Sequence, residues 1–221
     1  MKTMMKQVGL LSMILVSALA VGCLSKGAAS AAKPEKKIRI ACVGDSITAG
    51  GYPAILNKLL GDRYEVLNLG VSGATLMKKG DYSYWGLGKI EEAAKFGPDI
   101  VTIMLGTNDA KPQNYRQHPE TFIEDYKALI AAMKGLPSKP KVYVMIPVPV
   151  FGNGGFGIDG TVLRKEVTPL IIKAAKETRT KTIDLYTPLA GSPAMFPDNV
   201  HPTADGAAVI ASQLHKVLVR R

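Results

Sequence analysis

From residue 38 onwards the sequence alternates between short apolar runs and longer amphipathic segments. Short, continuously apolar runs are typical of strands buried on both faces, and apolar residues at helical spacing are typical of helices packed on a sheet. Strand–helix alternation predicts an α/β fold in which a parallel sheet carries helices on both faces. The expected strands are 38–43, 65–69, 100–105, 141–146 and 182–185, and the expected helices are 53–60, 87–96, 119–133, 162–178 (kinked at Pro169) and 204–219.

The first 31 residues have the pattern of an export signal followed by a tether. Lys2 and Lys6 precede a nearly uniform apolar run, 8–21, which is too short for a comfortable membrane span. Cys23 follows a small-residue stretch similar to a bacterial lipoprotein box, and 29–31 offers an ordinary cleavage site instead. We therefore expect an exported protein, periplasmic, extracellular or lipid-anchored at the envelope, with a single domain over 32–221.

Composition argues against several classes of protein. Removal of Lys2 and Lys6 leaves 28 − 2 = 26 basic residues against 18 acidic ones, a net charge of +8, but the charges are dispersed rather than gathered into a nucleic-acid-binding patch. The three histidines are scattered, so we expect no metal site and no cofactor. The other cysteine, Cys42, lies in an apolar run and is expected in the core. Membrane association is expected only through a lipid on Cys23.

Four polar loops lie where function collects in open parallel sheets, at the carboxyl ends of the strands. Ser46 follows the first strand, Gly70 ends the second, Asn108 follows the third, and Asp198 and His201 precede the last helix. Taken singly, each loop could be a turn or a helix cap.

Taken together, these loops hold the parts of one acyl-transfer mechanism. Ser46 would be the nucleophile, His201 its base, and Asp198 the carboxylate that orients the imidazole. The oxyanion would be bound by the backbone N–H groups of Ser46 and Gly70 and by the Asn108 side chain.

The loop sequences resemble the blocks of the SGNH hydrolases, also called GDSL esterases. The matching blocks are 44–46, Gly70, 106–109 and 198–201, in the family's order, with Ile47 where the family usually has Leu. The resemblance implies a three-layer α/β/α sandwich similar to flavodoxin, metal-free ester hydrolysis, and the roles just given for Ser46, Gly70, Asn108, Asp198 and His201. A GxSxG elbow, the mark of α/β-hydrolases, does not occur.

The substrate is the least constrained part of this interpretation. Trp85 and Phe151 lie in aromatic and glycine-rich segments that suit a sugar, although both segments could equally be core and connection. Asp45 and Asp109, beside the site residues, are further candidates for substrate contacts. The overall similarity is to carbohydrate O-acetylesterases, which implies an O-acetylated glycan or small acylated molecule as substrate. Two alternatives stay open: a lysophospholipase or thioesterase acting on longer acyl chains, and a non-catalytic glycan-binding lipoprotein.

Overall fold

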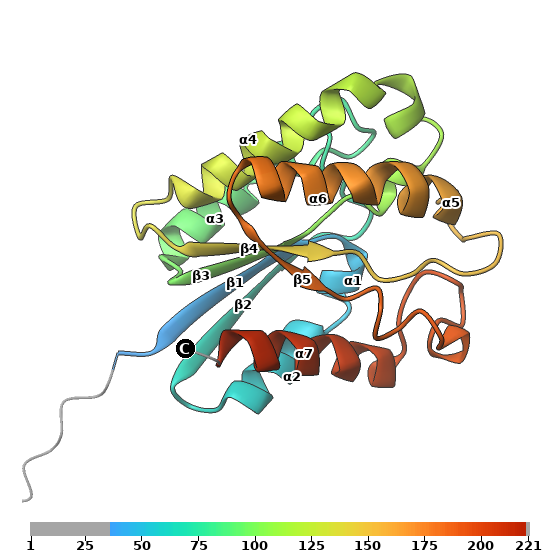
Figure 1. Ribbon diagram of the computed structural model, residues 1–221. Helices are drawn as coiled ribbons and strands as arrows, with labels where there is room; N and C mark the ends of the chain where they lie inside the picture. The colour runs from blue at the N-terminus through green and yellow to red at the C-terminus, as the bar shows by residue number, and fades with distance from the viewer. Residues whose placement is uncertain (1–35, 220–221) are drawn as a thin grey trace, which may run out of the picture. The chain divides into compact units, whose positions relative to one another are not determined.

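The computed structural model describes residues 36–219, and Figure 1 shows their arrangement. The expected signal peptide, the tether and Cys23 lie outside the described residues. Within 36–219 no helix is long and apolar enough to cross a bilayer.

A five-stranded parallel sheet with the order β2-β1-β3-β4-β5 forms the centre of this domain. Its strands are β1 (Ile38–Gly44), β2 (Tyr64–Gly70), β3 (Ile100–Met104), β4 (Lys141–Ile146) and β5 (Lys181–Asp184). β1 and β3 are nearly all apolar and lie between other strands, as expected for strands covered on both faces. At their carboxyl ends, Gly44 pairs with Gly70 on one side and with Met104 on the other.

Helices cover both faces of the sheet, which gives three layers (Figure 1). The helices are α1 (Ser46–Ala49), α2 (Tyr52–Leu60), α3 (Lys89–Phe96), α4 (Phe122–Lys134), α5 (Gly160–Val162), α6 (Thr168–Glu177) and α7 (Ala204–Leu218). The core under α2 and α7 includes Leu56 and Ile210, whereas the core under α3, α4 and α6 includes Ala93, Tyr126 and Ile171. Short 3₁₀ turns occupy Tyr84–Gly86, Asn108–Ala110, Tyr115–Gln117, Pro119–Thr121 and Pro193–Met195.

The connections after β1 and β2 leave toward opposite faces, since α2 packs on one side of the sheet and α3 on the other. β1 and β3 therefore flank the switch point of the sheet, where ligand sites of open parallel sheets form. The predicted α/β class and parallel sheet are confirmed. Cys42 is fully buried in β1, as predicted, and burial raises the pKa of its thiol to about 11.

One helix differs from its expected form. The predicted helix 162–178 is instead α5, a π-helical turn at Leu163–Val167, and α6, which has Pro169 in its first turn. Proline lacks an N–H and is therefore tolerated in the first turn of a helix but not in its interior. The wider π turn before α6 replaces the regular helical hydrogen bonds that Pro169 would interrupt. The hydroxyl of Thr168 donates to the carbonyl of Leu163 at 2.7 Å and fixes this junction.

Candidate active site

Ser46 stands at the sharp turn from β1 into α1. A Cβ on Gly44 would lie 2.0 Å from Oγ1 of Thr48 and 2.8 Å from the carbonyl oxygen of Met104, so only glycine fits there. Asp45 caps α1, because its Oδ1 accepts the N–H of Ile47 at 3.0 Å. The turn places half-buried Ser46 at the carboxyl edge of the sheet, as the first residue of a helix.

His201 links Ser46 to Asp198 in a continuous hydrogen-bonded chain. Its Nε2 lies 2.8 Å from Ser46 Oγ, and its Nδ1 lies 2.7 Å from Asp198 Oδ2. An ionised Asp198 accepts the Nδ1–H, which leaves Nε2 free to accept the hydroxyl proton of Ser46. The three side chains predicted to act together are therefore brought together, in an order suited to removing the serine proton.

Asp198 is held by its own loop. Its Oδ1 accepts the backbone N–H groups of Val200 at 3.0 Å and His201 at 2.6 Å. Although partial burial raises the pKa of Asp198, these amides and the His201 ring together lower it below the usual value. The carboxylate thus stays ionised beside the imidazole, where it favours an imidazolium during the reaction.

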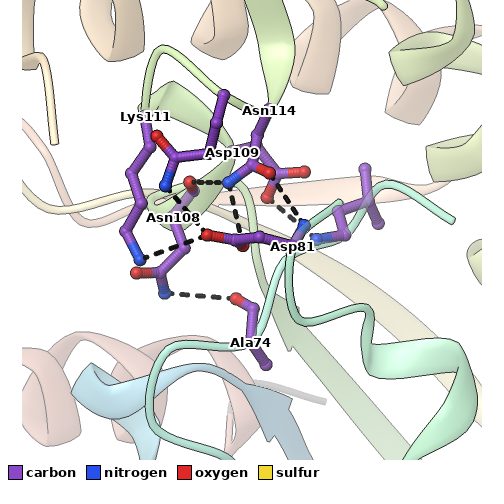
Figure 2. A network of polar contacts seen from close by, with 8 residues as sticks. Ala74, Asp81, Asn108, Asp109, Lys111 and Asn114 are labelled. Atoms are coloured by element: carbon purple, nitrogen blue, oxygen red, sulfur yellow. Dashed lines mark hydrogen bonds and ion pairs between the residues drawn. The ribbon is translucent and has the colours of Figure 1, made fainter. Parts of the chain in front are cut away.

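Asn108 lies in the 3₁₀ turn after β3 and borders the same space as Ser46. Figure 2 shows its side-chain nitrogen directed at the carbonyl oxygen of Ala74, at 3.1 Å. The backbone carbonyl of Asn108 accepts a hydrogen bond from the side chain of Asn114 at 3.0 Å. One amide hydrogen of Asn108 is thereby used to fix the side chain, and the second is available to a ligand.

Asp109, next to Asn108, fixes the segment after β2. Its two carboxylate oxygens accept the backbone N–H groups of Leu76 and Met77, both at 2.8 Å. Burial raises the pKa of Asp109 to about 7, against the lowering effect of these two amides, and the neighbouring Asp45 raises it further. Burial likewise raises the pKa of Asp45 to about 6, while the Ile47 amide and the charge of His201 oppose that rise.

The structure does not bring Gly70 to the site as predicted. Its N–H donates to Oδ1 of Asn68 at 2.9 Å, and a Cβ on Gly70 would lie 2.2 Å from the backbone nitrogen of Ala49. Gly70 is therefore glycine so that α1 can approach β2. Gly73, with φ +82°, lines the pocket that also contains Ser46 and Asn108. Gly73, three positions later, therefore lies nearer than Gly70 to the space where the oxyanion donor was expected.

Two pockets meet at Ser46 and His201. One, of about 360 Å³, is bordered by Ile47, Ala49 and Pro202. The other, of about 320 Å³, is bordered by Asn108, Lys111 and Phe156. A substrate bound at Ser46 can therefore extend in two directions.

The four residues expected to contact substrate lie elsewhere. Asp45 and Asp109 are fully buried and serve as a helix cap and an amide acceptor, so they do not face a ligand. The Trp85 ring packs against the core, with its N–H donating to the carbonyl of Leu76 at 3.0 Å. Phe151 packs against Phe196 with 5.1 Å between ring centroids. None of the four borders either pocket at Ser46.

Sequence reasoning missed Lys111 and Phe156, which do border the site. Phe156 is 66% exposed, and its ring centroid is 5.1 Å from that of His201. The available signal was a bulky aromatic residue in the middle of a glycine-rich run. Within residues 36–219 no three His, Cys, Asp or Glu side chains gather closely enough to hold a metal ion.

The fold is a flavodoxin-like α/β fold, and hydrogen-bonded Ser, His and Asp side chains lie at the switch point of its sheet. This combination has the geometry of a serine hydrolase. Residues 42–209 match the GDSL-like lipase/acylhydrolase family, and the chain belongs to that family.

Curated relatives agree with this assignment. The chain is 34% identical to an acetylxylan esterase of Xylanibacter ruminicola, over 81% of this chain and 43% of that protein. It is 29% identical to a multidomain esterase of Ruminococcus flavefaciens, over 51% of this chain and 14% of that protein. The chain thus spans less than half the length of either relative.

Solved structures with the same fold include an acetylxylan esterase of Geobacillus stearothermophilus, with TM-score 0.64, 20% identity, and coverage of 84% of this chain and 96% of that one. They also include an aryl esterase of M. smegmatis, with TM-score 0.65, 21% identity, and coverage of 82% of this chain and 98% of that one.

Proposed function

We propose that this chain is a serine carboxylic-ester hydrolase that removes short acyl groups, above all acetyl, from O-acylated carbohydrate. The observation that carries the proposal is the hydrogen-bonded series Ser46–His201–Asp198, with distances of 2.8 and 2.7 Å. A serine hydroxyl is nearly inert until a base takes its proton, and a carboxylate at Nδ1 of His201 favours the tautomer whose Nε2 can take it.

The proposed reaction passes through an acyl-enzyme. Oγ of Ser46 attacks the ester carbonyl carbon while Nε2 of His201 takes the hydroxyl proton. The carbon–oxygen bond to the alcohol then breaks, and His201 returns its proton to the departing alcohol oxygen. Water, deprotonated by His201, attacks the acyl carbon, releases the carboxylic acid and regenerates the Ser46 hydroxyl. These steps use only side chains of this chain, so activity should survive removal of divalent metals by EDTA.

The negative oxygen of the tetrahedral intermediate needs preorganised donors. The N–H of Ser46 lies in the first turn of α1, where an amide has no partner within the helix. Asn108 and Gly73 line the pocket at Ser46, which supports the second hydrogen of the Asn108 amide and the N–H of Gly73, in place of Gly70, as further donors. This set supplies three donors from three loops.

A short acyl group on a sugar can be accommodated at Ser46. The pocket bordered by Ala49, Gly50 and Pro202 has a volume of about 360 Å³, ample for an acetyl group. The acetylxylan esterase relative of Xylanibacter ruminicola supports a carbohydrate ester as the substrate class.

The first test is hydrolysis of p-nitrophenyl acetate by the wild-type protein and its Ser46→Ala variant, each with and without EDTA. Turnover by the wild type alone, unchanged by EDTA, is the expected result. Equal rates for the two proteins would overturn the serine mechanism. Binding of a glycan with no hydrolysis of any ester between pH 6 and 9 would instead favour the non-catalytic alternative.

A series of p-nitrophenyl esters from two to twelve carbons separates the two enzymatic possibilities. We expect kcat/KM to fall beyond four carbons, as it should for an enzyme whose natural acyl group is acetyl. A rise toward eight or more carbons would point to a lysophospholipase or thioesterase.

Export and lipid attachment remain proposals, because residues 1–31 lie outside the described part of the chain. The charged start, the apolar run 8–21 and Cys23 support them. Cell fractionation and labelling with a radioactive fatty acid, repeated on a Cys23→Ala variant, would test both. Label that persists in the variant would overturn lipid attachment at Cys23.

A further inference from the structure

Phe156 occupies a backbone position that does not suit it. The N–H of Ile158 donates to the carbonyl of Gly155 at 2.9 Å, which closes a turn with Phe156 and Gly157 at its centre. Both central residues have positive φ, +55° and +78°, as in type I′ turns. Gly, Asn and Asp are the residues that favour such positions, and a bulky aromatic side chain there strains the backbone.

The Phe156 side chain gains little from packing in return. It is 66% exposed, the largest exposed fraction among the large hydrophobic residues of the described chain. Strain and exposure both reduce stability, and a residue that carries both is better explained by a ligand than by the fold.

The turn holding Phe156 is attached to the catalytic loop. The N–H of Phe151 donates to the carbonyl of Asn199 at 2.9 Å, and the side chain of Asn199 donates to the carbonyl of Gly154 at 3.3 Å. A Cβ on Gly155 would lie only 2.7 Å from the carbonyl oxygen of Asp198. These contacts fix the Phe156 ring in edge contact with the His201 ring, at 67° between ring planes.

This position places Phe156 beside the departing alcohol. His201 must come within hydrogen-bond distance of the alcohol oxygen in order to protonate it. Because Phe156 touches the His201 ring and borders the pocket of Ser46, the group attached to that oxygen lies against the phenyl ring.

Lys111 supplies a polar partner in the same pocket. Its side chain is 15% exposed, and Nζ lies 4.0 Å from Oδ2 of Asp81, beyond hydrogen-bond range (Figure 2). Asp81 already accepts hydrogen bonds from Gln113 at 2.9 Å and Asn114 at 3.0 Å. The ammonium of Lys111 therefore retains donors for a ligand.

We infer that Phe156 and Lys111 form the binding subsite for the sugar ring that leaves as the alcohol, with the ring stacked on Phe156 and its oxygens bonded to Lys111. This inference rests on the proposed esterase function and adds the residues that select the alcohol. An aromatic face with a few convergent polar donors matches a pyranose, which has an apolar face and a rim of hydroxyls.

The test compares kcat/KM for an acetylated xylo-oligosaccharide with kcat/KM for ethyl acetate, which has no ring to stack. We expect Phe156→Ala to lower the glycan-to-ethyl-acetate ratio about tenfold, equivalent to about 1.4 kcal/mol, and Phe156→Trp to restore it. Lys111→Met should lower the ratio about threefold. Ile172→Ala, which truncates an exposed apolar side chain on α6, should leave it unchanged.

Phe156→Asn separates the ring from the backbone strain. Asn suits a positive φ, so this variant should unfold at a higher temperature than the wild type while showing the same loss of ratio as Phe156→Ala. An unchanged ratio in either variant overturns the subsite. Equal losses on glycan and ethyl acetate also overturn it, because Phe156 would then act through His201. A wild type that hydrolyses neither ester overturns the proposed function itself.

Discussion

Two segments that meet at Ser46 are held in opposite ways. In the loop with Asp198 and His201, the two side chains are held together by hydrogen bonds that span two or three residues, and Asn199 adds bonds to Phe151 and Gly154. The segment from Gly73 to Met77 is fixed from outside, because Asp109 binds the amides of Leu76 and Met77 across 33 and 32 residues. The proposed base is thus oriented by its own loop, whereas the proposed oxyanion donor at Gly73 depends on a tertiary contact.

Removing the base should have the largest effect. We expect His201→Ala to lower kcat by about 10⁴–10⁶, because Ser46 then has no proton acceptor. Asp198→Asn should lower kcat less, by about 10²–10⁴, since the amide can still accept the loop N–H groups but presents a donor to Nδ1. Steady-state kinetics with p-nitrophenyl acetate would measure both losses.

Asp184→Asn is a matched control for Asp198→Asn, since Asp184 also accepts backbone N–H groups in a turn, those of Tyr186 and Thr187. It should leave kcat unchanged. A loss in Asp198→Asn as large as that in His201→Ala would mean that the carboxylate does more than orient the ring.

On the other side of Ser46, Asn108→Ala should lower kcat by about 10²–10³ with a smaller change in KM, as expected for loss of one oxyanion donor. Asn114→Ala is the control, because Asn114 supports the same turn without bordering the pocket. Asn114→Ala should lower the melting temperature and leave kcat close to the wild-type value. Near-normal kcat in Asn108→Ala would remove Asn108 from the oxyanion site.

The same contrast explains which features could be predicted from the sequence. Asp198 and His201 are three residues apart in one loop, and Ser46 lies two residues after an apolar strand, so residue type and position were sufficient to predict that these side chains lie close together. Strand–helix alternation was likewise sufficient for the α/β class. Gly73 could not be preferred to Gly70 from the sequence, because only three positions separate the two glycines and only the fold shows that Gly70 ends β2 against α1.

The environments of Asp109 and Phe156 also depend on contacts with distant segments, although the glycine-rich run around Phe156 was a partial signal. Asp109 has the residue type of a substrate contact, but its buried amide partners come from a distant segment. Phe156, unlike Phe151, has a positive φ, a largely exposed ring and a contact with His201, and a sequence displays none of these.

Stability measurements would test the assignment of the two glycines. Gly70→Ala should lower the free energy of unfolding by about 3 kcal/mol, because its Cβ would overlap the backbone of Ala49. Gly73→Ala should cost about 1 kcal/mol, from positive φ alone, since the nearest atom to its Cβ is the Tyr82 ring at 3.8 Å. Urea unfolding of both variants measures the difference, and a larger cost for Gly73→Ala would reverse the assignment.

A pH-dependent effect of similar size is expected from the buried carboxyl group of Asp45, next to Ser46. Burial raises the pKa of Asp45 from 3.8 to about 6, so between those values the unfolded chain has released a proton that the folded chain retains. Stability must therefore fall as pH rises through this range. Between pH 5 and pH 7 this loss is about 1.4 kcal/mol, one pKa unit's worth.

Asp45→Asn should remove that loss while keeping the oxygen that accepts the Ile47 N–H. Urea unfolding at pH 5 and pH 7 would therefore give a smaller decline for this variant than for the wild type. The substitution should also lower the pKa of Asp109, because the charge of Asp45 contributes to raising it. Both changes reduce the decline in stability between pH 5 and pH 7. Asp62→Asn, at an exposed position, should leave the wild-type decline unchanged. An Asp45→Asn variant with the full decline would place the titrating group elsewhere and leave Asp45 as a helix cap alone.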